Sequence, residues 1–210
     1  NNNNNNSQQK STTSLQAQND NINNNVVYAT NIKMSNNGIQ HLKQYEKLSL
    51  KPYYATKKEK ELGIRTIGYG HTIKKDDPSW LVNAKEITEQ QAEQLLINDV
   101  SLSEHYIRQL IMPTLNNGLQ NPNALPQKLV DVIISMVFNA GIGNFRDESI
   151  NPFYTRLKAC RLDKDSGKIN MQDYNYTVAA IKYSLTKQKG KELDGLKARR
   201  AVECNMAMLK

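Results

Sequence analysis

The feature that most constrains the fold is an acidic residue followed by two short strand-like segments. Leu50 to Ala55 and Ile64 to Tyr69 are rich in Tyr and Ile, which favour strands, and the polar stretch 56–63 joins them. The second segment continues into a Gly-x-Gly-His sequence that ends at Thr72. Because Glu46 precedes the first segment, the sequence predicts a carboxyl group beside a β-hairpin.

Elsewhere the sequence predicts helices and loops, without a second convincing strand signal. Apolar residues recur at helical spacing from Ser35 up to Glu46, and a capping box of Thr88 and Gln91 opens a long second helix. Segment 129–138 is apolar nearly all round, which indicates a central buried helix. Further helices are expected over 153–160, 174–183 and 196–209, with an Asn-rich loop over 113–126. The expected fold class is α+β, with a small β-hairpin lobe packed beside a mostly helical lobe.

The first 33 residues differ in composition from the rest of the chain. Asn, Gln, Ser and Thr dominate them, and such a segment buries too little apolar surface to offset its chain entropy. We expect a disordered linker over 1–33 and one folded domain over 34–210. The chain starts without Met and without the pattern of a signal peptide, so a piece of a longer or processed protein is expected. No apolar run reaches the roughly 20 residues of a membrane span, so no membrane insertion is expected.

The chain is basic, with 28 Lys and Arg against 20 Asp and Glu and a formal net charge of +8. This balance favours polyanionic partners, including the carboxylates and phosphates of a bacterial cell wall. The basic residues are scattered and lack interleaved aromatic residues, so nucleic-acid binding is not expected. The two cysteines, Cys160 and Cys204, lack the spacing of metal ligands, and whether they pair is open. Segment 163–169 resembles a calcium loop but lacks its closing Glu, so no metal or cofactor is expected.

Glu46 taken alone would be interpreted as a solvent-exposed residue or an ion-pair partner. Its place beside a hairpin changes this, because an apolar wall raises the pKa of a carboxyl group and favours its protonated form. Cleavage of a glycosidic bond needs such a proton donor, together with a second group that positions water or supports the oxocarbenium-like transition state. The Thr66 hydroxyl is a candidate for part of that second role, although a β-branched residue in a strand needs no function.

Several further motifs accompany the acid in a fixed order along the chain. They are Glu46, Pro52-Tyr53, Thr66-Ile-Gly-Tyr-Gly-His-Thr72, Phe138-Asn-Ala-Gly-Ile-Gly143 and Gly195-Leu-x-x-Arg199-Arg200. Over about residues 36–210 the chain thereby resembles the phage-type lysozymes, the endolysin and muramidase family that includes tail-spike lysozymes and secretion-system effectors. The resemblance implies a lysozyme-like fold with a cleft between the two lobes. It also implies hydrolysis of the β-1,4 bond between N-acetylmuramic acid and N-acetylglucosamine in peptidoglycan.

The same resemblance implies roles for individual residues and for the whole chain. Glu46 matches the family's general acid, Thr66 its hairpin threonine, and His71 a motif histidine that usually forms structural hydrogen bonds. The positions carried over as substrate-binding are Tyr53, Gly70, His71, Thr72, Phe138 and Asn139. A monomer is expected to act at the bacterial cell wall, in the periplasm or outside the cell, after delivery by export or lysis. If the chain is an effector, an immunity or inhibitor protein could block its cleft.

Ala55 departs from the family pattern. The family normally has Asp two positions after the residue that matches Tyr53, where it activates water or stabilises the intermediate, and a methyl group can do neither. Segment 47–75 contains no Asp at all. Three interpretations stay open: Ala55 is an inactivating substitution, Glu59 or Glu61 replaces the carboxylate, or the chain is a catalytically inactive cell-wall glycan-binding module. Loss of an acid–base partner costs about 10² to 10⁴ in rate, so residual hydrolysis should remain detectable.

Overall fold

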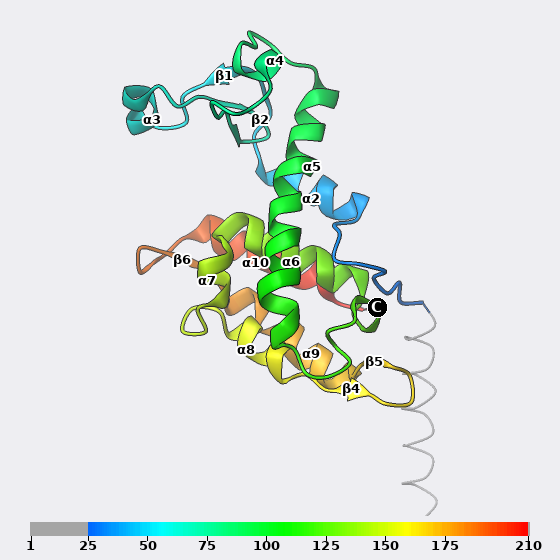
Figure 1. The fold of residues 1–210 in the computed structure, drawn as a ribbon. Coiled ribbons are helices and arrows are strands. Elements are labelled where there is room, and N and C mark those ends of the chain that lie inside the picture. The colour runs from blue at the N-terminus through cyan, green and yellow to red at the C-terminus, as the bar shows by residue number, and fades with distance from the viewer. Residues whose placement is uncertain (1–24, 210) are drawn as a thin grey trace, which may run out of the picture.

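The computed structural model describes residues 25–209, in which two hydrophobic clusters define a small lobe and a larger helical lobe (Figure 1). The small cluster consists of the buried side chains Ile67, Leu81, Ile87, Ala92 and Leu95. Helix α5 (Glu89–Tyr106) runs from the small lobe into the helical lobe (Figure 1). Its consecutive residues Leu95 and Leu96 belong to the two different clusters. One continuous helix therefore ties the two lobes together.

The small lobe contains the predicted hairpin. Strands β1 (Ser49–Tyr53), β2 (Thr66–Gly68) and β3 (His71–Thr72) form one antiparallel sheet in this order. Thr66 pairs with Tyr53 on one side and with Thr72 on the other. The short helix α4 (Ser79–Val82) adds the buried Leu81 to the core of this lobe. Both strands are shorter than the predicted segments 50–55 and 64–69. Strand β1 begins one residue earlier than predicted and ends two residues earlier, and β2 covers only the middle of its predicted segment.

The polar connection 56–63 contains a short helix, α3 (Lys57–Leu62), which is absent from the sequence-based expectation. The Thr56 hydroxyl accepts a hydrogen bond from the Glu59 N–H at 3.1 Å, and Gly63 ends the helix with a left-handed φ of 68°. Good helix formers lie between these two caps, so the signal for the helix was present in the sequence. Figure 1 shows α3 at the outer end of the hairpin.

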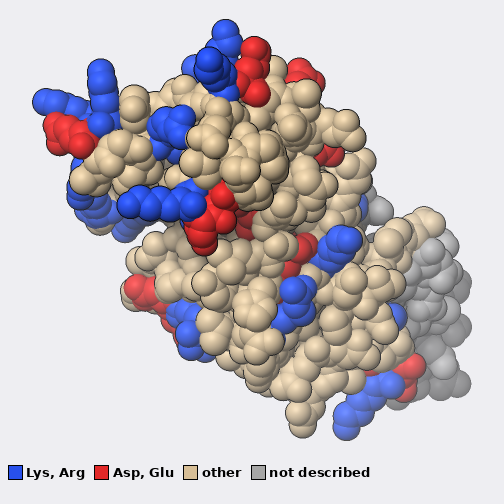
Figure 2. All heavy atoms as spheres, turned by 45° about the horizontal axis from the view of Figure 1, so that its top comes forward, with Lys and Arg blue, Asp and Glu red and all other residues tan. Residues whose placement is uncertain are grey.

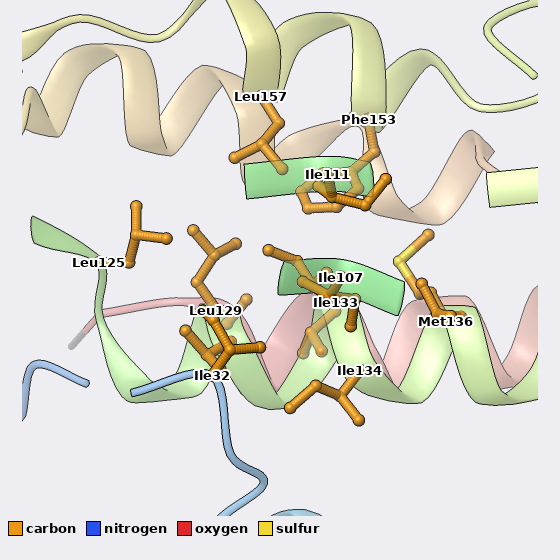
Figure 3. Packing of buried hydrophobic residues seen from close by; sticks show 14 of the residues in the cluster. Ile32, Ile107, Ile111, Leu125, Leu129, Ile133, Ile134, Met136, Phe153 and Leu157 are labelled. Atoms are coloured by element: carbon orange, nitrogen blue, oxygen red, sulfur yellow. The ribbon is translucent and has the colours of Figure 1, made fainter. Parts of the chain in front are cut away.

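Helix α6 (Gln127–Ala140) is the predicted central helix, and its residues from Leu129 to Val137 are all buried. Figure 3 shows its side chains Leu129 and Ile133 packed among apolar side chains from other parts of the main cluster, such as Ile107. The other helices of this lobe are α2 (Asn36–Tyr45), α7 (Ile142–Arg146), α8 (Pro152–Ala159), α9 (Met171–Ala179) and α10 (Asp194–Ala207). A π-helical turn (Ile107–Ile111) follows α5, and 3-10 turns lie at Met112–Thr114, Pro122–Ala124 and Ile181–Tyr183. The α+β class is confirmed.

The expectation of a single hairpin is wrong, because the helical lobe carries two more. Strand β4 (Leu162–Asp163) pairs with β5 (Lys168–Ile169), and β6 (Lys187–Gln188) pairs with β7 (Lys191–Glu192). Strands of two residues are too short to show an alternating pattern in the sequence. Cys160 and Cys204, whose pairing was open, are both free and buried.

The packed part of the chain begins before residue 34. The backbone around Tyr28 forms a β-bridge to Pro126, with Ala29 N–H donating to the Leu125 carbonyl at 2.8 Å. Ala29 and Ile32 are buried in the main core. The expected linker therefore does not extend to residue 33, and its first 24 residues lie outside the described part of the chain. Within residues 25–209 no helix has the length and apolar content needed to cross a membrane.

Candidate active site

Glu46 lies where the helical lobe passes into the small lobe. Its backbone N–H donates to the Leu42 carbonyl at 3.0 Å and closes α2, after which the chain enters β1. Its carboxylate faces the turn between β2 and β3, since a Cβ atom added to Gly70 would come within 3.3 Å of Glu46 Oε2. Gly70 also has a φ of 84°, which favours glycine. The Gly-x-Gly-His turn thus brings its backbone against the carboxylate.

The environment of Glu46 favours its protonated form. Burial raises the pKa of the Glu46 carboxyl, and the positive charge of Arg199 only partly opposes this effect. The Glu46 side chain retains 28% of its exposure, so it is shielded but still open to a ligand. Arg199 Nη1 lies 3.9 Å from Glu46 Oε1, beyond hydrogen-bonding distance. A raised pKa and partial exposure are two properties that a general acid requires.

Thr66 and Tyr53 come together in the sheet of the small lobe. They are cross-strand partners in β1 and β2, and Thr72 is the partner of Thr66 in β3. Thr66 is buried at 4% exposure, whereas Tyr53 is 37% exposed. Tyr53 therefore presents an aromatic surface on which a sugar ring can stack.

Ala55 and the two nearby acids lie beyond the end of β1. Ala55 is exposed and precedes Thr56, the residue that caps α3. Glu61 is exposed on the same helix. Glu59 has one carboxylate oxygen, Oε2, that is buried without a hydrogen-bond partner. Glu59 as a whole is partly exposed, and both acids belong to α3, which lies beyond the end of β1.

His71 forms hydrogen bonds through both ring nitrogens. Its Nδ1 lies 2.9 Å from Asp99 Oδ2 on α5, and its Nε2 lies 3.0 Å from Asp77 Oδ2 in the loop after β3. Asp77 also accepts a hydrogen bond from the Lys74 N–H at 2.8 Å, within a turn between β3 and α4. This arrangement fits a structural histidine. Within residues 25–209 no group of acids, histidines or cysteines is placed to hold a metal ion.

The stability contributed by His71 should depend on pH. The hydrogen bond to Asp99, helped by the bond to Asp77, raises the pKa of His71 above 6.5 despite its burial. Because folding raises the pKa of His71, its protonated ring stabilises the folded state. This contribution is complete below pH 6.5 and is lost as the pH rises through the raised pKa. His71→Asn should therefore cost about 2 kcal/mol at mildly acidic pH and clearly less above pH 9. Urea unfolding of both proteins at the two pH values measures this, and an equal cost at both would contradict it.

Phe138 and Asn139 lie on the opposite, helical side of the junction, at the end of α6. Phe138 packs partly buried against the main core. The Asn139 amide oxygen accepts a hydrogen bond from Arg200 Nη2, and the residue lines a hollow of about 670 Å³ with Lys187 and Lys189. The predicted substrate-binding residues thus come from both lobes.

A buried charged cluster behind Glu46 was not predicted as part of the site. Arg199 and Arg200 both pair with Glu203. Ser135 and His41 also contact Glu203. The only signal in the sequence was the i, i+3 and i, i+4 spacing of two arginines and a glutamate on the last helix.

A hairpin lobe joined to a helical lobe, with a shielded acid at the junction, defines a lysozyme-like protein. The phage lysozyme family model matches residues 43–203, and the chain belongs to this family. The endolysin of Salmonella phage P22 is 31% identical over 172 residues, which cover 82% of this chain and 95% of that protein. The endolysin of Bacillus phage PZA is 32% identical over 145 residues, or 66% of this chain, and the chain spans only 49% of its length.

Solved structures confirm the lysozyme-like fold. A crystal structure of a P22 lysozyme mutant has a TM-score of 0.56 and 29% identity, and the match covers 83% of this chain and 97% of that one. The muramidase domain of SpmX from Asticaccaulis excentricus has a TM-score of 0.55 over 85% of this chain and 99% of that one. Its 21% identity shows a shared fold alone.

Proposed function

We propose that this chain is a peptidoglycan muramidase that hydrolyses the β-1,4 bond between N-acetylmuramic acid and N-acetylglucosamine. Its family and the endolysins among its relatives support a lysozyme-type glycoside hydrolase that acts on the bacterial cell wall. The observation that carries the proposal is the shielded Glu46 carboxyl, whose pKa is raised. A protonated Glu46 can give its proton to the leaving glycosidic oxygen.

The group that would activate the attacking water is weaker in this chain than in an enzyme with two catalytic carboxylates. Thr66, in the strand beside β1, is the group we assign to positioning the attacking water. A hydroxyl can orient water but cannot take its proton or stabilise a cationic intermediate as a carboxylate does. With Ala55 in place of the usual Asp, slow hydrolysis is the expected activity.

Basic side chains support binding to an anionic wall polymer. Figure 2 shows a group of Lys and Arg at the left of the small lobe, where Figure 1 places α3 and β1. The exposed lysines of this region are Lys47, Lys51, Lys57, Lys58 and Lys60. Lys187, Lys189 and Lys191 are exposed on the β6–β7 hairpin of the helical lobe. Positive charge on both lobes favours a glycan that carries carboxylates or phosphates.

Neither Glu59 nor Glu61 is expected to replace the missing Asp. Glu59 Oε2 is buried without a hydrogen-bond partner, and α3, which carries both acids, lies at the outer end of the hairpin (Figure 1). Glu59→Gln and Glu61→Gln should each change residual hydrolysis far less than the roughly 10²-fold loss typical of an acid–base residue. Release of reducing sugar from purified cell walls measures both variants. A hundredfold loss in either one would establish a relocated carboxylate.

The alternative function is a glycan-binding module that no longer cuts, and the exposed methyl group of Ala55 favours it. Two measurements together distinguish the functions: sedimentation with insoluble peptidoglycan, and release of reducing sugar. A muramidase releases sugar with time, whereas a binding module sediments with the polymer and releases none. We also propose that the chain acts as a monomer at the cell wall and, if it is an effector, that an immunity protein blocks its cleft.

A further inference from the structure

Glu203 is the centre of a buried cluster of polar and charged side chains behind Glu46. The residue has no exposed surface, and its carboxylate accepts hydrogen bonds from Ser135 Oγ at 2.7 Å and from Arg199 Nε at 3.1 Å. It also pairs with Arg200 Nη1 and with His41 Nε2. A buried carboxylate with this many partners is held in one position.

These contacts also hold the Arg199 guanidinium in one position. Its Nε is bound by Glu203, its Nη2 donates to Ser135 Oγ at 3.2 Å, and its flat face lies over the Tyr45 ring at 4.7 Å. Only Nη1 points to Glu46, at 3.9 Å from Oε1. Each neighbour fixes a different side of the guanidinium, and together they leave it just beyond hydrogen-bonding distance of Glu46.

Glu203 and Glu46 therefore compete for one guanidinium. Burial opposes the ionisation of Glu203, but its bond to His41 and the charges of Arg200 and Arg199 outweigh burial and lower its pKa to about 2. Glu203 is thus ionised at neutral pH. If Arg199 instead formed a direct hydrogen-bonded pair with Glu46, the pKa of Glu46 would fall by about 1 to 3 units. Glu46 would then be an ionised ion-pair partner and not a proton donor.

We propose that Glu203 is a positioning residue that keeps the Arg199 guanidinium out of hydrogen-bonding contact with Glu46, so that the Glu46 carboxyl stays available to carry a proton. The inference rests on the proposed role of Glu46 as general acid. Among the described residues, Arg199 is the charged group that lowers the pKa of Glu46, while Arg200 and His41 contact Glu203 and Tyr45 contacts Arg199.

The test is a ¹³C NMR titration of the Glu46 side-chain carboxyl in the full chain. In Glu203→Gln the freed Arg199 should turn toward Glu46 and lower its pKa by about one unit. In Arg199→Met the pKa should rise, because burial then acts unopposed. When Arg199→Met is already present, adding Glu203→Gln should leave the pKa of Glu46 unchanged. An unchanged pKa in Glu203→Gln, or an equal fall with and without Arg199, would overturn the proposal.

Glu203→Gln alone leaves Arg200 without its charged partner, so a second variant guards against loss of folding. Glu203→Gln combined with Arg200→Gln removes both charges and should still lower the pKa of Glu46. The control is Glu104→Gln, which alters another buried glutamate that bonds to the Met34 N–H and should leave Glu46 unchanged. The titration needs no catalysis. A wrong proposal on Glu203 is thus separable from a wrong proposal on hydrolysis, which would show as no release of sugar.

Discussion

Ala55→Asp should raise the rate of reducing-sugar release from purified peptidoglycan by about 10²- to 10⁴-fold, the contribution usual for a catalytic acid–base group. Ala55 follows β1 by two residues and is exposed, so an added carboxylate has room and costs little stability. Tyr53 at the end of β1 is the partner of Thr66, which places the new carboxylate beside the strand that carries the hydroxyl. A carboxylate there can take a proton from water or support a cationic intermediate.

Ala55→Asn is the matched control, because it has the size of Asp without its charge. It should release sugar no faster than the parent chain. If Ala55→Asp also gave no increase in sugar release but still sedimented with peptidoglycan, the chain would be a binding module. Adding a carboxylate at position 55 would then not be enough to restore hydrolysis.

Glu46→Gln should lower sugar release by a similar factor of about 10² to 10⁴, both in the parent chain and in Ala55→Asp. Gln keeps the shape of the side chain but has no proton to donate to the leaving oxygen. Activity of the parent should fall as pH rises through the raised pKa of Glu46, because the ionised form is not a donor. The basic limb of the pH profile should therefore lie above 4.5, the ordinary value for Glu.

Stability separates this loss from damage to the fold. Glu46→Gln should be as stable as the parent or slightly more stable, because burial disfavours the charge that the change removes. Glu86→Gln is the activity control. It changes an exposed acid between α4 and α5 and should release sugar at the parent rate. A Glu46→Gln variant that releases sugar at the parent rate would remove Glu46 from the mechanism.

Much of the fold and the location of the acid could be predicted from the sequence, because those signals are local. Apolar spacing located α2, a segment apolar nearly all round located α6, and the Gly-x-Gly-His string located the turn that faces Glu46. Helix α3 was also locally encoded, but its charged residues look like a polar connection unless the caps Thr56 and Gly63 are recognised.

The cluster around Glu203 could not be predicted, because its members come from three distant helices. His41 lies on α2, Ser135 on α6 and Glu203 on α10, and only the folded chain brings them together. Charged residues on a helix are usually exposed, so the complete burial of Arg200 and Glu203 contradicts the ordinary expectation. For the same reason the sequence alone did not show that Arg199 lies next to the acid.

The most direct test of the proposed function is to identify the reducing ends that the unmodified chain releases from purified peptidoglycan. Fragments would be reduced with borohydride, separated and identified by mass spectrometry, with Glu46→Gln treated in parallel. A muramidase leaves N-acetylmuramic acid at the new reducing ends, and these should accumulate with the parent chain and not with Glu46→Gln. New ends carrying N-acetylglucosamine, or no new ends from either the parent or Ala55→Asp, would contradict the proposal.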